Sequence, residues 1–182
     1  DTMRGKESSK QVEKRVIVVL VDDQPNVLAR VSSLIGRRNY NIHTLTATET
    51  DMPGITRITA VVSGNEYEMH QIVSQLEKLE NVRQVDEIER GSGLYRELLL
   101  VKVAADKVNR GDIRDIADIY RAKIIDLSPQ SMILELTGSS NKIDVFLDVL
   151  SCYEILQVCR TGTTGIERDK INNYDANLKK ER

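Results

Sequence analysis

Acidic residues gather near the end of a predicted strand, and they are the first candidates for chemistry. Asp22 and Asp23 follow an apolar run, and Glu49 and Asp51 flank a loop further along the chain. Close carboxylates can work as acid and base, but acidic side chains are also common at turns, where they hydrogen-bond to the local backbone. No established partner orders these carboxylates, so we interpret them as turn residues.

The histidines and cysteines give little support for catalysis or metal binding. His43 stands on a predicted strand and His70 beside the apolar stripe of a predicted helix, so we expect both at the surface or its boundary. Cys152 and Cys159 are seven residues apart with no second close pair, which is not the ligand pattern of a zinc site. We expect both cysteines to be core thiols.

Other ligand classes also find little support. Residues 91–93 and 162–165 contain glycines but lack the full spacing and the lysine of a phosphate loop, so we interpret both as linkers. An RNA-binding sheet needs exposed aromatic residues on its central strands, whereas these strands carry Val, Ile and Thr. An acylphosphatase-like site needs an arginine in the first strand-to-helix loop, and residues 22–26 contain none.

The turn at residues 22–26 is the most informative stretch. It separates a β-branched, apolar run at residues 15–21 from apolar residues that recur at helical spacing between Val27 and Ile35. A strand that turns sharply into a helix presents free backbone N–H groups, which can hold an anion such as a carboxylate. Pro25 and its Asp and Asn neighbours also suit an ordinary capped helix, so the local pattern leaves both interpretations open.

The elements that must position this turn follow a repeated order. Strands are predicted at residues 15–21, 40–48, 56–63, 82–88, 97–104, 123–127, 132–136 and 155–161, and helical stripes begin at Val27, Met69, Ile113 and Ile143. Each half therefore has the ferredoxin-like βαββαβ plan. We predict an α+β fold with two such units in tandem.

These patterns also predict how the chain is divided and assembled. We expect a flexible arm at 1–14, a first unit at 15–90, a linker at 91–94, a second unit at 95–168 and a loose tail at 169–182. The first strand is apolar on both faces, and a helix layer covers only one of them. The other face must pack against another subunit or the other half, and we infer a homo-oligomer, most simply a dimer.

Composition narrows the setting of the protein. The chain of 182 residues is 40% hydrophobic and 30% charged with a net charge of −2, which is ordinary for a globular protein and gives no electrostatic case for nucleic acid or an anionic membrane. The apolar run at 16–21 is too short to cross a bilayer, and the polar first residues are unlike a signal peptide. Two cysteines fit a reducing compartment, so we expect a cytoplasmic protein.

Several stretches in a fixed order carry a resemblance to a known family. In the first half they are VLARVSSLIGRRNYNIHTLT, PGITRITAVVSG and QLEKLENVRQV, and in the second half YRELLLVKV, IADIYRAKIIDLSP, LELTG and CRTG. Residues 15–168 thereby resemble the regulatory small subunits of acetolactate synthase, also called acetohydroxyacid synthase. Within them, the first unit resembles an ACT domain, a module that senses small molecules.

The resemblance implies a protein without an active site. Such a subunit binds a separate thiamine-diphosphate-dependent catalytic subunit, raises its activity and confers feedback inhibition by branched-chain amino acids. It implies no cofactor in this chain, because thiamine diphosphate, magnesium and any FAD belong to the catalytic partner. It also implies that two ACT domains pair side by side and bind the effector between the first turn of one subunit and the start of the second strand of the other.

Carried over by position, the resemblance implies a two-part effector site. The residues are Asp23, Pro25, Asn26, Val27 and Leu28 on the turn and Asn41 and Ile42 on the strand. Backbone N–H groups at residues 26–28 would hold the effector carboxylate, and Asp23 would meet its ammonium group. Asn41 would hydrogen-bond to the ligand across the interface, and Ile42 would line the side-chain pocket.

Two positions depart from the family pattern and bear on the effector. The family usually has Asn at the position of Asp23 and Gly at the position of Asn26. A glycine lets the backbone approach a ligand closely, and an acid adds negative charge near a bound carboxylate. Inhibition by valine is therefore in question. A stand-alone amino-acid sensor that acts on transcription or another enzyme is the alternative, and an enzyme in its own right is a weaker one.

Overall fold

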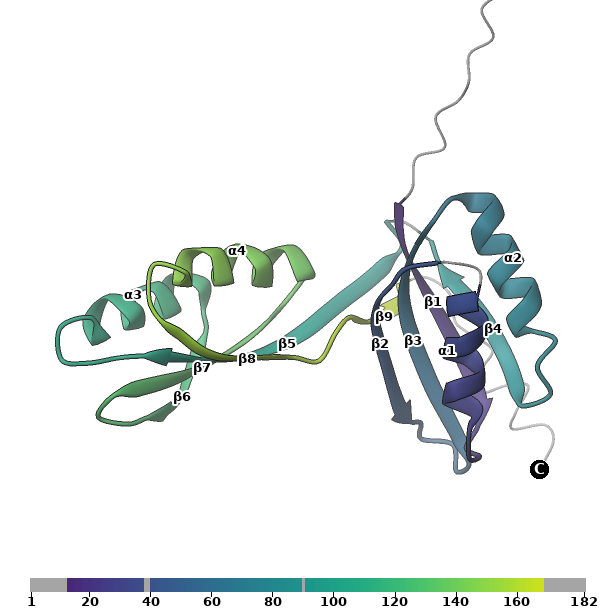
Figure 1. Cartoon of the computed structure of the whole chain (residues 1–182), viewed down its shortest axis with the longest axis horizontal. Helices are drawn as coiled ribbons and strands as arrows, with labels where there is room; N and C mark the ends of the chain where they lie inside the picture. Colours follow the sequence, from purple (N-terminus) through teal and green to yellow (C-terminus); the bar gives the residue numbers. More distant parts are fainter. Residues whose placement is uncertain (1–12, 38–39, 90, 169–182) are drawn as a thin grey trace, which may run out of the picture.

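The computed structural model describes residues 13–37, 40–89 and 91–168, and it contains two α+β units (Figure 1). The first unit holds β1 (Glu13–Asp22), α1 (Val27–Arg37), β2 (Ile42–Glu49), β3 (Ile55–Gly64), α2 (Glu66–Leu76) and β4 (Val82–Ile88). The second holds β5 (Gly93–Ala104), α3 (Arg110–Tyr120), β6 (Lys123–Leu127), β7 (Ser131–Gly138), α4 (Ser140–Leu150), β8 (Ile155–Arg160) and β9 (Thr164–Glu167). The predicted order of strands and helices in both units is confirmed.

Each unit is an antiparallel sheet with two helices on one face. The strand orders are β2-β3-β1-β4 in the first unit and β6-β7-β5-β8 in the second. Corresponding strands occupy corresponding places, so the two sheets share the ferredoxin-like arrangement. The second helix of the first unit begins with a full capping box, in which Asn65 and Glu68 bond to each other's backbone N–H groups.

Two separate cores hold the helices to the sheets. In the first unit, Ile17, Val19 and Val21 of β1 are buried with apolar residues of α1 and α2. In the second, apolar residues of β5 and β7 pack against α3 and α4, with Phe146 as the largest buried side chain. Because alternate strand residues point to opposite faces, these sets define the helix-covered face of each sheet.

The second face of the first sheet is covered by the end of the same chain. Val18 and Leu20 of β1 are only 2% and 3% exposed although they point away from the helices. Gly162 lies against Thr44 and Thr46 on that face, and the Arg57 guanidinium donates a 2.5 Å hydrogen bond to the carbonyl of Gly165. One apolar face of β1 is thus covered by the helices of its own unit, and the second half of the chain lies on the opposite face of the sheet, one of the two coverings expected.

The covering segment contains a strand that the sequence interpretation missed. Residues 162–165 were predicted to be a linker, but Thr164 and Gly165 belong to β9, which pairs antiparallel with the first residues of β5. β5 is correspondingly longer than predicted and begins at Gly93, inside the expected linker at 91–94. The sequence of the short β9 shows no alternation of apolar and polar residues. The strand forms because it pairs with β5 and not because it buries one face in a core.

The structure also bears on the predicted boundaries of the folded chain and on the predicted burial of the two cysteines. The arm expected at 1–14 extends two residues too far, because β1 already starts at Glu13. The rest of the expected arm and the tail expected at 169–182 lie outside the described residues. The prediction of core thiols is wrong, because Cys152 and Cys159 are both exposed. Cys152 follows α4 in a turn, and Cys159 pairs with Leu100 on the open face of the second sheet. Within the described ranges, no helix has the length and apolarity needed to cross a bilayer.

Candidate functional site

The turn between β1 and α1 is held by backbone hydrogen bonds to two neighbouring loops. The N–H of Asp22 donates to the carbonyl of Asn81 at 2.9 Å, and the N–H of Asp23 donates to the carbonyl of Gly54 at 2.8 Å. The side chain of Asn81 also accepts from Arg30 and donates to Gln24. Asn81 and Gly54 were not singled out from the sequence, because only the fold brings their loops beside the turn.

Asn26 adopts a left-handed backbone conformation at the start of α1. Its φ is +69°, a region that glycine occupies freely and that asparagine tolerates better than most residues. The position at which the resemblance implies glycine therefore has the conformation that glycine favours. Asn26 meets the requirement with a side chain that is exposed beside the helix start.

The helix start offers free backbone donors. Among the residues that the structure describes, the N–H groups of Asn26, Leu28 and Ala29 have no hydrogen-bond acceptor. The N–H of Val27 makes only a long contact of 3.4 Å with the carbonyl of Gln24. These donors and the positive end of the helix dipole favour an anion at this turn.

The side chains of the turn divide into exposed and structural ones. Asp23 and Pro25 are exposed, and Leu28 is 43% exposed on the first turn of α1. Val27 is only 4% exposed and belongs to the first core, so its side chain anchors the helix rather than facing a ligand. Its backbone can still contribute to the row of donors.

The strand side of the predicted site begins just before β2. The carbonyl of Asn41 accepts a 3.0 Å hydrogen bond from the N–H of Ser63, which leaves the exposed Asn41 side chain available. Ile42 is half-buried and packs against the first core. The pairing of β2 with β3 is interrupted between Ile42 and Thr44, and at that point His43 Nε2 lies 2.6 Å from Ser63 Oγ.

The turn side and the strand side lie at opposite ends of one sheet. Ile42 aligns with Val62 on β3, which in turn aligns with Arg15 near the beginning of β1, whereas the turn follows Asp22 at the end of β1. At about 3.4 Å per residue the two parts are roughly 20 Å apart. One chain therefore cannot bring them together around a single amino acid.

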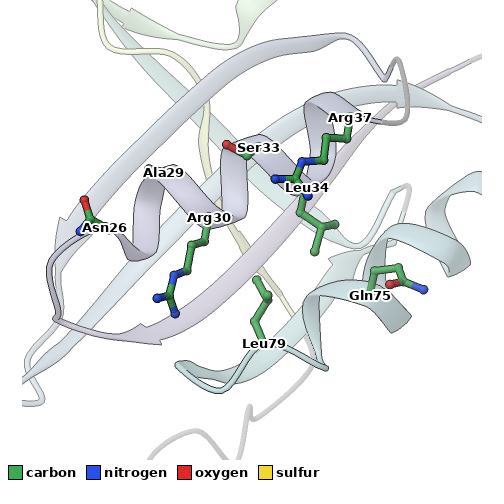
Figure 2. Close-up of a pocket in the computed structure, with 8 residues that line it drawn as sticks. All are labelled: Asn26, Ala29, Arg30, Ser33, Leu34, Arg37, Gln75 and Leu79. Atoms are coloured by element: carbon green, nitrogen blue, oxygen red, sulfur yellow. The ribbon is translucent and has the colours of Figure 1, made fainter.

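A groove runs from the turn along the outer side of α1 toward α2. It has a volume of about 460 Å³ and is lined by Asn26, Ala29, Arg30, Ser33, Leu34, Arg37, Gln75 and Leu79. Figure 2 shows Arg30 and Arg37 projecting from α1, with Gln75 and Leu79 coming from the segment at α2. No acidic residue is among these lining residues.

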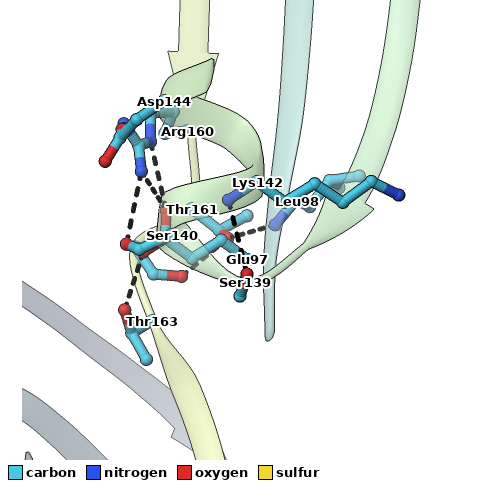
Figure 3. Close-up of polar contacts among 10 residues, drawn as sticks. Glu97, Leu98, Ser139, Ser140, Lys142, Asp144, Arg160, Thr161 and Thr163 are labelled. Atoms are coloured by element: carbon cyan, nitrogen blue, oxygen red, sulfur yellow. Dashed lines mark hydrogen bonds and ion pairs between the residues drawn. The ribbon is translucent and has the colours of Figure 1, made fainter. Parts of the chain in front are cut away.

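The strongest polar network lies in the second unit and centres on Glu97 of β5 (Figure 3). Its carboxylate is almost fully buried and accepts from Arg160 Nη2 at 2.6 Å and from Thr163 Oγ1 at 2.7 Å, and Ser140 also donates to it. Arg160 makes a further 2.6 Å ion pair with the exposed Asp144. The network joins β5, the start of α4, the end of β8 and the segment that leads to β9.

The charge of Glu97 is stabilised by these donors. Burial acts to raise the pKa of its carboxyl, but the hydrogen bonds from Ser140, Thr163 and Arg160 and the positive charge of Arg160 outweigh burial and hold the pKa below its ordinary value. No sequence motif marks this network, because its members are separated by up to 66 residues. The sequence offered one signal of this network, the charged Glu97 at the start of a largely apolar predicted strand.

The histidines and the possible metal ligands of the described chain are not gathered into one site. His43 and His70 are exposed, as predicted, and come from β2 and α2. Across residues 13–37, 40–89 and 91–168, no three His, Cys, Asp or Glu side chains are grouped so that they could hold a metal ion. The geometry favours a ligand-binding turn whose remaining contacts with the ligand come from a second molecule.

Comparison with known proteins decides the family. Residues 17–84 match the family described as the AHAS small subunit-like ACT domain, and residues 96–169 match the family described as the small subunit of acetolactate synthase. The acetolactate synthase small subunit of Mycolicibacterium smegmatis is 41% identical over 82% of this chain and 88% of its own length. This chain belongs to the acetolactate synthase small-subunit family.

Two further relatives agree with this assignment. The acetolactate synthase isozyme 3 small subunit of Escherichia coli is 37% identical over 87% of this chain and 98% of its own length. The crystal structure of the acetolactate synthase small subunit of Thermotoga maritima has a TM-score of 0.81 and 31% identity, and the match covers 87% of this chain and 99% of that one. The resemblance and the α+β fold expected from the sequence, two ferredoxin-like units of which the first is an ACT domain, are confirmed.

Proposed function

We propose that this small subunit is a non-catalytic regulator that activates the catalytic subunit of acetolactate synthase and mediates feedback by branched-chain amino acids. The catalytic partner carries thiamine diphosphate and magnesium, and the regulatory chain carries no cofactor. The two act together in the cytoplasm. Membership of the small-subunit family and the free N–H groups at the start of α1 support this proposal.

The effector site is formed between two copies of the chain. The observation that carries this proposal is the separation of the turn from the start of β2 within one sheet. A two-fold axis reverses the direction of the partner strand, so it places the start of the partner's β2 beside the turn of the first copy. β2 is an edge strand, and an edge strand with few charged residues is available for such pairing.

In this arrangement each part of the site has a distinct role. The N–H groups at residues 26–28 hold the effector carboxylate, and Asp23 meets its ammonium group. Asn41 from the second copy donates or accepts a hydrogen bond across the interface. Ile42, which packs partly into its own core, offers only its remaining surface to the effector side chain.

Regulation follows from a shift between two arrangements of the subunits. A bound effector stabilises the dimer geometry that presents a less productive surface to the catalytic subunit. The effector can shift this equilibrium only by its difference in affinity for the two states. The second unit helps to bind the catalytic subunit or transmits the effector signal to it.

The test is the activity of the cognate catalytic subunit with and without this chain, titrated with valine, leucine and isoleucine. Activation followed by inhibition is expected, and the most potent amino acid identifies the effector. Activation without inhibition would limit the function of this chain to activation. The missing inhibition would then be attributed to Asp23 and Asn26. No activation and no co-purification would favour a stand-alone sensor.

A further inference from the structure

Two arginines on α1 have no acidic partner. Arg30 makes one hydrogen bond, to the side chain of Asn81 at 3.3 Å, and within the described ranges neither Arg30 nor Arg37 forms an ion pair. The helix itself contains no Asp or Glu. In a chain whose net charge is −2, this helix presents a local excess of positive charge.

The helix sets the spacing of the Cα atoms of Arg30 and Arg37. They are seven residues apart, so they lie on one side of α1 about two turns or 10 Å apart. Leu34 between them and Leu79 across the groove are half-buried apolar residues, and Gln75 and Ser33 add polar groups. The groove thus has apolar residues at its floor and a positively charged arginine near each end.

This spacing fits an extended ligand better than a small one. A free amino acid offers a single carboxylate to two arginines whose Cα atoms are about 10 Å apart, whereas a helix with acidic residues two turns apart presents two carboxylates at the same spacing. A groove between two packed helices is also a common receptor for a third helix. Charge complementarity therefore favours an acidic helical segment.

The two terminal segments of the chain are poor occupants of the groove. Residues 1–12 contain two acidic and three basic residues, and residues 169–182 contain three acidic and four basic residues, so both segments are net positive. A second copy docked symmetrically on the same groove would bring its own Arg30 and Arg37 against the first pair. Neither the terminal segments nor a symmetrically docked second copy therefore matches the charge of the groove.

We propose that the groove between α1 and α2 is the docking site for an acidic helical segment of the acetolactate synthase catalytic subunit. This inference rests on the proposed function, and it names the surface through which that function acts. The groove begins at Asn26, which belongs to the turn of the effector site. Effector binding and docking of the catalytic subunit therefore share one helix.

The test is the affinity of the complete small subunit for its cognate catalytic subunit, measured by titration calorimetry at several salt concentrations. The double substitution Arg30→Glu and Arg37→Glu is expected to weaken binding about 100-fold, because it replaces two charge-assisted contacts with repulsion. Binding by the unsubstituted chain is expected to weaken as salt rises. Arg30→Ala with Arg37→Ala serves as a second variant that lacks the repulsion if the charge reversal disturbs folding.

The control is Lys107→Glu with Arg114→Glu, which changes the net charge equally at exposed positions of the second unit. It is expected to bind almost as tightly as the unsubstituted chain. The docking site would be overturned if the groove variants bound the catalytic subunit as tightly as the unsubstituted chain does. It would also be overturned if the control variant lost as much affinity as the groove variants. A change only in self-association would assign the groove to a contact between copies. If the unsubstituted chain itself neither binds nor activates the catalytic subunit, the proposed function fails and the docking site fails with it.

Discussion

At the scale of single residues, the left-handed conformation of Asn26 explains why this position constrains the turn. Glycine reaches a φ of +69° without cost, and asparagine is among the few other residues that do so readily. The sequence indicated a departure from the family pattern but not that the conformation is retained. Retention means that the backbone donors of the turn keep their direction, and the difference lies in the added side chain.

Substitutions at Asn26 separate conformation from ligand access. Asn26→Ala is expected to lower the free energy of unfolding by about 1 kcal/mol, because alanine has the cost of the left-handed region without asparagine's local hydrogen bonding. Asn26→Gly is expected to keep the stability and to strengthen the response to branched-chain amino acids. Urea unfolding and inhibition titrations provide the two measurements. An unchanged response in the glycine variant would remove Asn26 as the cause of altered sensing.

Asn41 is the side chain that tests the strand half of the site. Its backbone carbonyl is committed to Ser63 while its side chain is exposed, so Asn41→Ala is expected to leave the fold intact. Effector inhibition should weaken about 10-fold, the loss of one hydrogen bond to a polar ligand, while activation of the catalytic subunit stays near that of the parent. Equal loss of activation would make Asn41 structural instead.

At the scale of elements, the Glu97 network holds parts of the chain that are distant in sequence. Glu97→Gln removes the charge that Arg160, Ser140 and Thr163 surround, and it is expected to lower the free energy of unfolding by about 3 kcal/mol. Asp144→Asn is the matched control, because it removes an exposed partner of the same arginine and should cost less than about 1 kcal/mol. Thermal or urea unfolding distinguishes them, and equal effects would contradict a buried network.

The same network predicts how stability depends on pH. The pKa of Glu97 is lower in the folded chain than its ordinary value, so the folded state favours the ionised carboxylate. This contribution is fully present above the unfolded pKa of about 4.3 and is lost as the pH falls through the lower, folded value. Unfolding measured between pH 7 and pH 3 should show a smaller acid loss in Glu97→Gln than in the parent chain.

The elements also show where prediction from the sequence succeeds and fails. In the described ranges, the sequence pattern located the four helices, because each buries an apolar stripe against a core, and eight strands, although β6 among them is exposed along its whole length. β9 escaped because its few residues pair with β5 at a sheet edge, and the Glu97 network escaped because its members meet only after folding. The two halves of the candidate site came from family resemblance, and their separation by the length of the sheet needed the strand register.

At the scale of the whole molecule, the end of the chain completes the first unit. Removing residues 162–182 takes away the segment that lies on Thr44, Thr46 and Arg57. This loss is expected to cost about 3 kcal/mol of stability, because it uncovers part of the second face of the first sheet and also removes Thr163, a hydrogen-bond donor to the buried Glu97. The shortened chain should bind a hydrophobic dye and aggregate, whereas a chain that ends at Arg168 retains every described contact and should behave like the parent. Equal stability of the two would mean that another part of the chain covers this face.

The crossing of β9 onto the first unit has a consequence for synthesis on the ribosome. The strands β1 to β4 emerge first, but the segment that covers their second face follows β4 by more than seventy residues. At the usual rates of translation this delay is roughly 4–15 s. During that interval the part of this face formed by Thr44, Thr46 and Arg57 lacks its covering segment. The nascent first unit therefore finishes folding only when nearly all of the described chain has been made.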